Sequence, residues 1–191
     1  MRVYCINLDN RKERWDQTQE EMKVLGATPI RFSATLKRRR HSGCISSHMA
    51  LWSKVKDEGI VMVIEDDILF LDNAKENFEM ALHQLPEDWD MLYLGATLTK
   101  KIYRYSDNLY VLQGGSAAHG IIYNNQNGVI DYILKSHNRN RIDSFLRDDV
   151  QENFNCYMTR PMIAIQSPGF SNLIYKRTSG RAMRRAYKKY T

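Results

Sequence analysis

Short apolar runs alternate with longer amphipathic segments along the first half of the chain. The runs at 3–8, 29–32, 60–64 and 91–94 have the length and the residue types of strands. The segments between them repeat apolar residues at helical spacing, and glycine or proline stands near the end of each, at Gly26, Gly59 and Pro86. The predicted strands and helices therefore alternate as β-α-β-α-β-α-β. This alternation predicts an α/β fold with a mostly parallel central sheet flanked by helices, and parallel sheets bind ligands at the carboxyl ends of their strands.

The second half of the chain has weaker but readable patterns. Residues 103–113, 120–123 and 162–166 have strand-like composition, and 128–135 and 144–152 have helical spacing. Basic residues after 180 recur on one side of a helical repeat, which predicts a basic amphipathic helix. At 191 residues we expect one domain, at 1–178, followed by a basic tail or helix at 179–191.

The positive charge is concentrated at the C-terminal end. The net charge is +6, yet no Asp or Glu follows Glu152 and eight Lys or Arg do, so the first 152 residues carry −2. This asymmetry predicts an anionic partner for the tail, either an anionic membrane surface or negative groups of an acceptor, with no nucleic acid expected. A solvated tail is the alternative.

Cysteine usage and the length of the apolar runs bear on the compartment. Three widely spaced cysteines without a C-x-x-C pair indicate no disulfide framework and fit a reducing compartment. The N-terminal apolar run is too short for a signal peptide, and no run reaches the length of a membrane span. We expect a cytoplasmic protein, with peripheral membrane contact through the tail.

Three acidic residues, Glu65, Asp66 and Asp67, directly follow the apolar run at 60–64. Five consecutive apolar residues predict a central strand covered on both faces. The carboxylates therefore directly follow a buried segment, in a site of low dielectric constant. Their mutual repulsion there calls for a compensating cation. Carboxylate oxygens suit Mn²⁺ or Mg²⁺, whose shells substrate phosphates commonly complete. A solvated acidic turn is the alternative.

The junction after the first strand is rich in polar and basic residues. Asn7, Arg11 and Arg14 could meet a nucleotide there, although Arg11 and Arg14 would also suit a solvated helix surface. A G-x-G-x-x-G and a P-loop are both absent, which disfavours a dinucleotide-binding Rossmann protein and a P-loop NTPase.

His41, Cys44 and His48 lie close together in the sequence. Structural zinc needs a fourth ligand that this segment does not offer, and no neighbouring feature activates Cys44 as a nucleophile. The sequence therefore disfavours both sites and leaves helix capping by Ser46 or Ser47, with His48 near the ligand end of the helix, as the milder interpretation.

Several blocks, in this order and spacing, resemble glycosyltransferase family 25, which includes lipooligosaccharide and collagen galactosyl- and glucosyltransferases. They read VYCINLDNRKERW, GCISSHMALW, VIEDDILF and DWDMLYLG, and the later HGIIY, IDSFL and TRPMIAIQSPGFSNL also match. The block GC-x-x-SH-x-x-LW followed by EDD is the most specific part. The chain departs from the pattern in its short, basic connection at 34–43.

The resemblance implies a GT-A-like nucleotide-sugar-binding domain and an inverting transfer of galactose or glucose from a UDP-sugar to a glycan, lipid-linked or hydroxylated acceptor. The acidic triplet is similar to the D-x-D motif, which implies Glu65 and Asp67 as metal ligands, with Asp66 in support on the donor side. The matching blocks imply further donor-binding residues, namely Asn7, Leu8, Arg11, Arg14, Ser46 and His48.

An inverting transfer needs a base across the pocket from the metal. Asp143, which would cap a helix beginning at Ser144, is the candidate, and Asp148 and Asp149 are the reserves. Two other classes stay open: another metal-dependent nucleotide enzyme, such as a nucleotidyltransferase or phosphohydrolase, and a non-catalytic glycan-binding or nucleic-acid-binding module that uses the basic tail.

Overall fold

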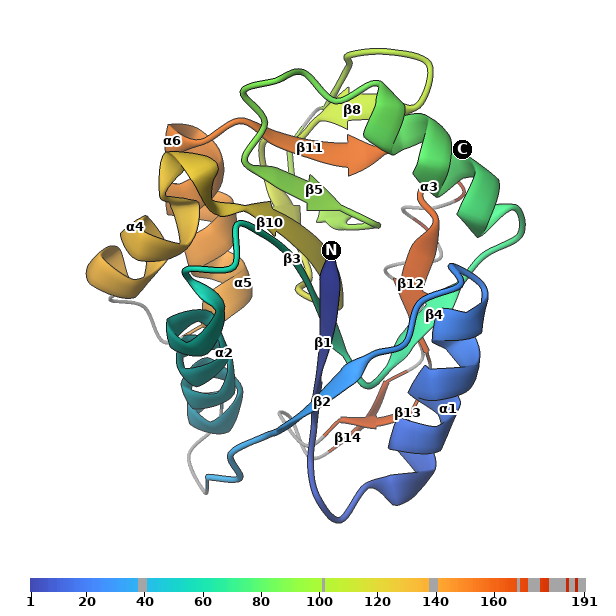
Figure 1. Cartoon of the computed structure of the whole chain (residues 1–191), viewed down its shortest axis with the longest axis vertical. Helices are drawn as coiled ribbons and strands as arrows, with labels where there is room; N and C mark the ends of the chain where they lie inside the picture. The colour runs from blue at the N-terminus through green and yellow to red at the C-terminus, as the bar shows by residue number, and fades with distance from the viewer. Residues whose placement is uncertain are drawn as a thin grey trace.

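The protein is a three-layer structure in which helices cover both faces of a central sheet (Figure 1). The computed structural model describes residues 1–37, 41–100, 102–137 and 141–167, the backbone of 169–171 and 176–178, and residues 185 and 188. The predicted α/β class is confirmed.

The central sheet has eight strands in the order β2-β1-β3-β10-β5-β11-β8-β7 within the described residues. Their bounds are β1 Arg2–Asn7, β2 Ile30–Ser33, β3 Ile60–Glu65, β5 Met91–Tyr93, β7 Tyr103–Arg104, β8 Leu109–Val111, β10 Gly120–Asn124 and β11 Cys156–Thr159.

The sheet is mixed, with a parallel core around β1. Strand β1 pairs in parallel with β2 and β3, and β5 pairs in parallel with β11. Strand β10 lies antiparallel between β3 and β5. Strands β1, β3 and β5 therefore point the same way, and their carboxyl ends lie along one edge of the sheet. Polar residues that follow these strands are thus brought together.

One face of the sheet is covered by α1 (Lys12–Lys23) and α3 (Ala74–His83), together with the two-stranded sheet of β4 (Ile68–Phe70) and β12 (Ala164–Gln166). Buried Met22 of α1 and Phe78 of α3 pack here against Ile64 and Leu92. The alternate side chains of each strand supply this core and the core on the opposite face.

The other face is covered by α2 (Ser42–Val55), α4 (Val129–Ser136) and one continuous helical stretch. Trp52, Ile130 and Phe145 pack here against Val63 and Tyr93. The helical stretch consists of α5 (Ile142–Phe145), a π-turn η2 (Leu146–Val150) and α6 (Gln151–Asn153).

Several elements differ from the predicted pattern. The single strand predicted at 103–113 is the hairpin β7–β8, because Ser106 donates its amide to Leu109 and reverses the chain. Strands β4 and β11 lie in segments for which no strand was predicted, and their partners come from distant parts of the chain. Short β6 (Thr97–Leu98) and β9 (Gly115–Ser116) form a separate antiparallel pair.

The C-terminal region is described only in part. Strands β13 (Gly169–Ser171) and β14 (Lys176–Thr178) form a hairpin. The predicted basic helix falls largely outside the described residues, which include only Arg185 and Lys188, both exposed and helical. The boundary between 178 and 179 stays a prediction. Among the described helices, none combines the length and apolarity needed to cross a bilayer.

Candidate active site

The acidic triplet lies at the carboxyl end of β3, in the middle of the sheet edge. Residues 61–64 of this strand are fully buried, and Glu65 donates its amide to the carbonyl of His119 at 3.0 Å. The turn is fixed beyond β3 by a 2.7 Å hydrogen bond from the amide of Ser167 to the carbonyl of Asp67. The backbone thus holds the three carboxylates at one place.

Asp66 is bound by groups from the first strand-helix junction. The Asn7 amide donates to Asp66 Oδ2 at 2.8 Å, and Arg14 donates to Asp66 Oδ1 at 2.9 Å. Asn7 is buried, and it accepts a 2.8 Å hydrogen bond from Arg31. Three predicted donor-site residues therefore meet, and both oxygens of Asp66 are engaged in holding β1, α1 and β3 together.

Among the described residues, the side chains of Arg11 and Leu8 make no hydrogen bond or ion pair with Asp66, although Asn7 also donates to the carbonyl of Arg11 at 3.1 Å. Arg11 pairs with the exposed Glu13 at 2.5 Å, and its amide bonds to the carbonyl of Leu8 at 2.9 Å. Both residues are half-buried at the turn after β1. No contact with the triplet is recorded for them among the described residues, so their role toward a donor stays a prediction.

The two outer carboxylates, Glu65 and Asp67, are strained electrostatically. Burial, followed by repulsion from Asp67 and Asp66, raises the pKa of Glu65 to about 8. Burial raises the pKa of Asp67 to about 6. The partner of Glu65 is Gln166, which donates to Oε2 at 3.3 Å, whereas the buried Asp67 Oδ1 has no hydrogen-bond partner.

These features fit a divalent cation. A buried carboxylate oxygen without a donor is costly, and a hard cation would satisfy it and relieve the repulsion between the carboxylates. Glu65 and Asp67 are the residues that would hold Mn²⁺ or Mg²⁺, as oxygen ligands preferred by both ions.

His48 faces Glu65 from α2. Its ring is 1% exposed, its Nδ1 lies 3.0 Å from the carbonyl of Cys44, and its Nε2 lies 3.9 Å from Glu65 Oε1. Burial lowers its pKa to about 4, so the ring is neutral near pH 7. Ser46 points elsewhere and accepts a 2.6 Å hydrogen bond from Lys37. The helix begins at Ser42, so neither Ser46 nor Ser47 caps it, contrary to the sequence interpretation.

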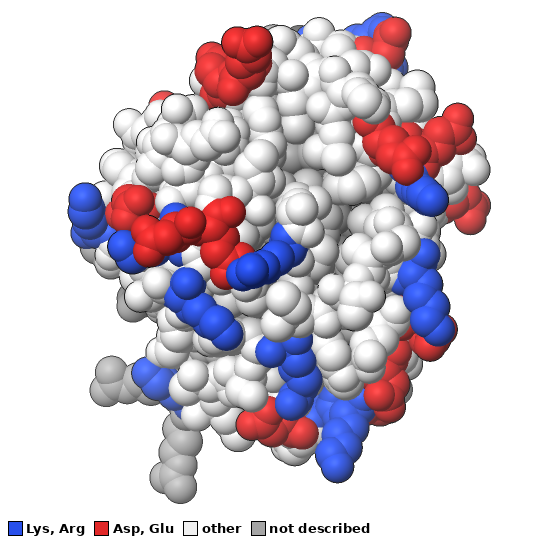
Figure 2. Space-filling model, in the orientation of Figure 1, with Lys and Arg blue, Asp and Glu red and all other residues white. Residues whose placement is uncertain are grey.

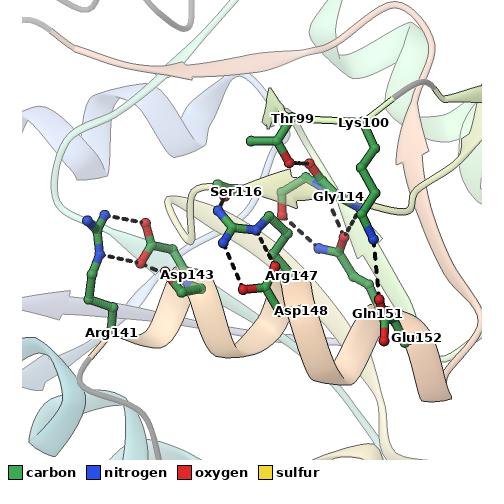
Figure 3. Close-up of polar contacts among 12 residues, drawn as sticks. Thr99, Lys100, Gly114, Ser116, Arg141, Asp143, Arg147, Asp148, Gln151 and Glu152 are labelled. Carbon is green, nitrogen blue, oxygen red and sulfur yellow. Dashed lines mark hydrogen bonds and ion pairs between the residues drawn. The ribbon is translucent and has the colours of Figure 1, made fainter.

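Asp143 lies in the first turn of α5 rather than at its cap. The helix begins at Ile142, after Arg141, and Arg141 donates to both carboxylate oxygens of Asp143 at 3.2 and 2.8 Å (Figure 3). The predicted cap at Asp143 is therefore wrong. The charge of Asp143 nevertheless contributes to raising the pKa of Glu65 and of Cys44.

Asp148 and Asp149, the two alternative candidates for the base, are hydrogen-bonded to other side chains. Asp148 pairs with Arg147 at 2.5 and 2.8 Å, and Arg147 also donates to Ser116 Oγ at 3.0 Å (Figure 3). Asp149 accepts a 2.7 Å hydrogen bond from Tyr132. Asp143 is thus the better placed of the three candidates.

Sequence reasoning missed Gln166 and Arg31 as parts of this site. Gln166 ends β12 and reaches Glu65, and Arg31 of β2 reaches Asn7. A polar residue at the end of the predicted run 162–166 was a usable signal for Gln166. Arg31 carried none, because arginine on an edge strand is usually a surface residue.

The surface around this edge carries many basic groups. Figure 2 shows Lys and Arg side chains more abundant over the middle and lower parts of the face in view, among scattered acidic groups. The ends of β1 and β2 lie in that part of the view (Figure 1). Such a surface favours an anionic ligand.

Comparison with known proteins decides the family. The model of glycosyltransferase family 25 (LPS biosynthesis protein) matches residues 39–170, which is more than half of the chain. This chain belongs to glycosyltransferase family 25. The matched region contains the GC-x-x-SH-x-x-LW block and the acidic triplet.

Two curated members of the family are similar over a short segment. Inactive glycosyltransferase 25 family member 3 of Mus musculus is 40% identical over 62 residues. Probable inactive glycosyltransferase 25 family member 3 of Rattus norvegicus is 36% identical over 58 residues. Each match covers 28% of this chain and 10% of the relative, so the segment shared with these relatives is about a tenth of their length.

Solved structures share the fold. A197 from STIV has a TM-score of 0.53 at 11% identity, with 93% of both chains covered. The glycosyltransferase involved in the glycosylation of the major capsid of PBCV-1 has a TM-score of 0.51 at 6% identity, with 82% of this chain and 79% of that chain covered. The predicted GT-A-like fold of this family 25 member is confirmed.

Proposed function

We propose that this family 25 chain transfers a hexose, galactose or glucose, from a UDP-sugar to a hydroxyl group of a glycan, lipid-linked or hydroxylated acceptor, with inversion at the anomeric carbon. The observation that carries the proposal is the pair Glu65 and Asp67 at the carboxyl end of β3, where one buried carboxylate oxygen has no donor. Family membership makes sugar transfer the reaction that such a site would serve.

Glu65 and Asp67 would hold Mn²⁺ or Mg²⁺ through their oxygens. A bound ion would supply charge stabilisation for the leaving diphosphate. Asp66 supports the site indirectly. Its contacts with Asn7 and Arg14 hold the turn that carries the two proposed metal ligands. Arg11, Leu8, Ser46 and His48 complete the proposed donor side.

Asp143 is the proposed base. It would accept the proton of the acceptor hydroxyl as that oxygen attacks the anomeric carbon from the side opposite the diphosphate. Its helix α5 packs on the same face of the sheet as α2, whereas α1, which carries Arg14, packs on the opposite face. Arg141 orients its carboxylate through two hydrogen bonds.

The test of the reaction is a donor panel with Mn²⁺, read as nucleotide release with and without candidate acceptors. We expect release of UDP from one UDP-hexose, dependent on the divalent ion and increased by an acceptor. Free sugar phosphate or nucleoside monophosphate as the product would instead indicate a nucleotidyltransferase or phosphohydrolase.

Asp143→Asn tests the base. General-base catalysis commonly contributes about 10²–10⁴-fold, so we expect a loss of this order in turnover with donor binding unchanged. Asp149→Asn is the matched control, because Asp149 accepts from Tyr132 and is expected to affect turnover little. Near-normal turnover of Asp143→Asn with intact donor binding would remove Asp143 from the role.

One observation favours a second function. The two curated relatives carry the word inactive in their names, which fits a non-catalytic glycan-binding module. Thermal unfolding with UDP and Mn²⁺ separates the two proposals, because a ligand that binds the folded state raises the unfolding temperature. Stabilisation by UDP that requires Mn²⁺ supports a donor site, and stabilisation by glycan alone supports the binding module.

A further inference from the structure

Cys44, His48 and Glu65 form a cluster of potential metal ligands on the α2 side of the sheet. One ligand atom from each residue lies within 4.8 Å of the others. Cys44 and His48 are one helical turn apart on α2, and Glu65 ends β3, so the third member comes from a distant part of the chain. Helical spacing alone would explain a Cys-His pair, but not the carboxylate facing it.

The hydrogen bond of His48 fixes which ring nitrogen faces the cluster. Nδ1 lies 3.0 Å from Cys44 O and 3.5 Å from Cys44 Sγ. A carbonyl oxygen only accepts, so we assign the proton of the neutral ring to Nδ1 on the shorter of these two contacts. Nε2 therefore keeps its lone pair. This nitrogen is buried, has no hydrogen-bond partner and lies 3.9 Å from Glu65 Oε1.

This arrangement is the one that metal-binding histidines adopt. Such residues usually donate their other ring N–H to a backbone carbonyl or carboxylate, which orients the ring and increases the basicity of the ligand nitrogen. In His48 the orienting bond is present, and the nitrogen that would bind a metal is the one without a partner.

We propose that Cys44, His48 and Glu65 bind a borderline-soft divalent ion, with Zn²⁺ as the natural occupant and Co²⁺ as its spectroscopic substitute. A thiolate, an imidazole and a carboxylate are ligands that zinc accepts together, and three protein ligands leave a fourth position open. Manganese and magnesium prefer oxygen ligands, which distinguishes this site from the proposed pair of Glu65 and Asp67.

The two sites share Glu65 and therefore compete. Binding at the cluster forms a metal–sulfur bond and releases the proton of the Cys44 thiol to solvent, so affinity rises with pH. Zinc at this site would draw the Glu65 carboxylate toward α2 and weaken its hold on a Mn²⁺ ion. The inferred site is thus inhibitory toward the proposed transfer, while the binding itself does not rest on that function.

Titration of the full chain with Co²⁺ tests the site directly. Coordination by a thiolate gives a near-ultraviolet charge-transfer absorption, which we expect to saturate at one ion per chain and to disappear on addition of Zn²⁺. Cys44→Ser should abolish the band and Cys156→Ser, a control at a buried cysteine of β11, should keep it. Absence of the band in the unaltered chain, or its persistence in Cys44→Ser, would overturn the proposal.

Two further variants keep the result interpretable if Cys44→Ser folds poorly. His48→Gln leaves the thiol in place, and we expect zinc affinity to fall at least about tenfold. Asp67→Asn should retain the Co²⁺ band but lose stabilisation by Mn²⁺, because Asp67 belongs only to the oxygen-ligated site. Unchanged zinc affinity in His48→Gln would contradict the site whatever the transfer assays show.

The same variants separate this inference from the proposed function. If the metal site and the proposed function both hold, low Zn²⁺ concentrations inhibit UDP release in the unaltered chain. Cys44→Ser should then need at least a tenfold higher Zn²⁺ concentration for the same inhibition. A cobalt band without any transferase activity would support the metal site alone. Transferase activity without the band would support the proposed function alone.

Discussion

The two oxygens of Asp66 are hydrogen-bonded to residues from different elements, and this explains how the acidic turn keeps its shape. Asn7 at the end of β1 binds one oxygen, and Arg14 on α1 binds the other. Both side chains of the Arg14–Asp66 pair are about 15% exposed or less, so the pair is screened little by solvent. Removing Arg14 therefore leaves the half-buried charge of Asp66 with the hydrogen bond from Asn7 but without its ion pair.

Arg14→Gln tests this role. We expect a loss of about 1–3 kcal/mol in the free energy of unfolding, because the Asp66 carboxylate loses its only recorded ion pair within the described residues. Arg11→Gln, at the residue just before the same helix, is the matched control, and its pair with exposed Glu13 predicts a change of about 1 kcal/mol or less. Urea denaturation measures both. Equal effects of the two variants would contradict the assignment.

The pH dependence of stability tests the strain at Glu65. The raised pKa, about 8 against an ordinary 4.5, means that the folded chain holds a proton which the unfolded chain has released. Stability contributed by this group is therefore lost as pH rises from the unfolded value through the folded one. Below about pH 6.5 the buried His48 and His119, whose pKa values are lowered to about 4, act in the opposite direction.

The informative window is thus about pH 6.5 to 8. In a chelator we expect stability to fall over this range by on the order of 2 kcal/mol, and Glu65→Gln should remove most of the fall. Addition of Mn²⁺ should restore more stability at the upper end, since the ion needs the ionised carboxylate. Thermal unfolding at several pH values, with chelator or with Mn²⁺, measures this change of stability. A fall of equal size in Glu65→Gln would assign the effect to other groups.

At the scale of elements, the helical stretch α5–η2–α6 holds the β9 strand in place through Gln151. This side chain is 2% exposed, and its amide oxygen accepts from Gly114 N and Gly115 N at 2.8 and 2.9 Å. Its amide nitrogen donates to Gly115 O and Tyr93 OH at 2.8 and 3.0 Å. Four backbone and side-chain groups are therefore satisfied by one residue.

Gln151→Met removes these bonds with little change in volume. We expect a loss of about 2–4 kcal/mol, because several buried polar groups would be left without partners. Glu152→Gln is the control on the same helix, since Glu152 makes an exposed pair with Lys100 at 3.2 Å and should matter by about 1 kcal/mol or less. Chemical denaturation compares them. A small effect of Gln151→Met would show that solvent or nearby groups replace its contacts.

Some of the strands and helices could be predicted from the pattern of neighbouring residues, and others could not. The apolar run of β3 and the amphipathic spacing of α2 and α3 were readable because strand and helix periods are local properties. Strands β4 and β11 were not, since each becomes a strand only by pairing with a distant segment. The hairpin β7–β8 did carry a local signal that the prediction of one run overlooked, since Ser106, Asp107 and Asn108 are residue types common in turns.

At the scale of the whole molecule, the charge asymmetry predicts an anionic partner for the C-terminal tail. The first 152 residues carry −2, and the basic residues after them give the chain its net charge of +6. We retain the proposal that the tail contacts an anionic membrane surface from the cytoplasmic side, with an anionic acceptor or a solvated tail as alternatives.

Deletion of residues 180–191 tests the tail. Five Lys or Arg are removed, and each basic residue near an anionic surface contributes about 1 kcal/mol, so binding to anionic liposomes should fall at least tenfold. Sedimentation with vesicles measures it, and neutral vesicles are the control, for which little binding is expected with or without the tail. Unchanged binding to anionic vesicles after the deletion would exclude the membrane contact.

The sequence by itself determined the α/β class, the order of the first strands and helices, and the place of the acidic triplet at the end of a buried strand. These follow from hydrophobic periodicity and from the identity of adjacent residues, which are local in the chain. The resemblance in the GC-x-x-SH-x-x-LW and EDD blocks also identified the family, and the family model confirms it.

Only the tertiary structure decided which side chains meet at that triplet. The parallel pairing of β1 with β3 brings Asn7 and Arg14 to Asp66, and the packing of α2 on the sheet brings His48 and Cys44 toward Glu65. The sequence disfavoured a Cys-His metal site for want of further ligands nearby, yet a carboxylate ligand arrives from β3. Strand register and helix packing depend on contacts between distant segments, so no local pattern encodes them.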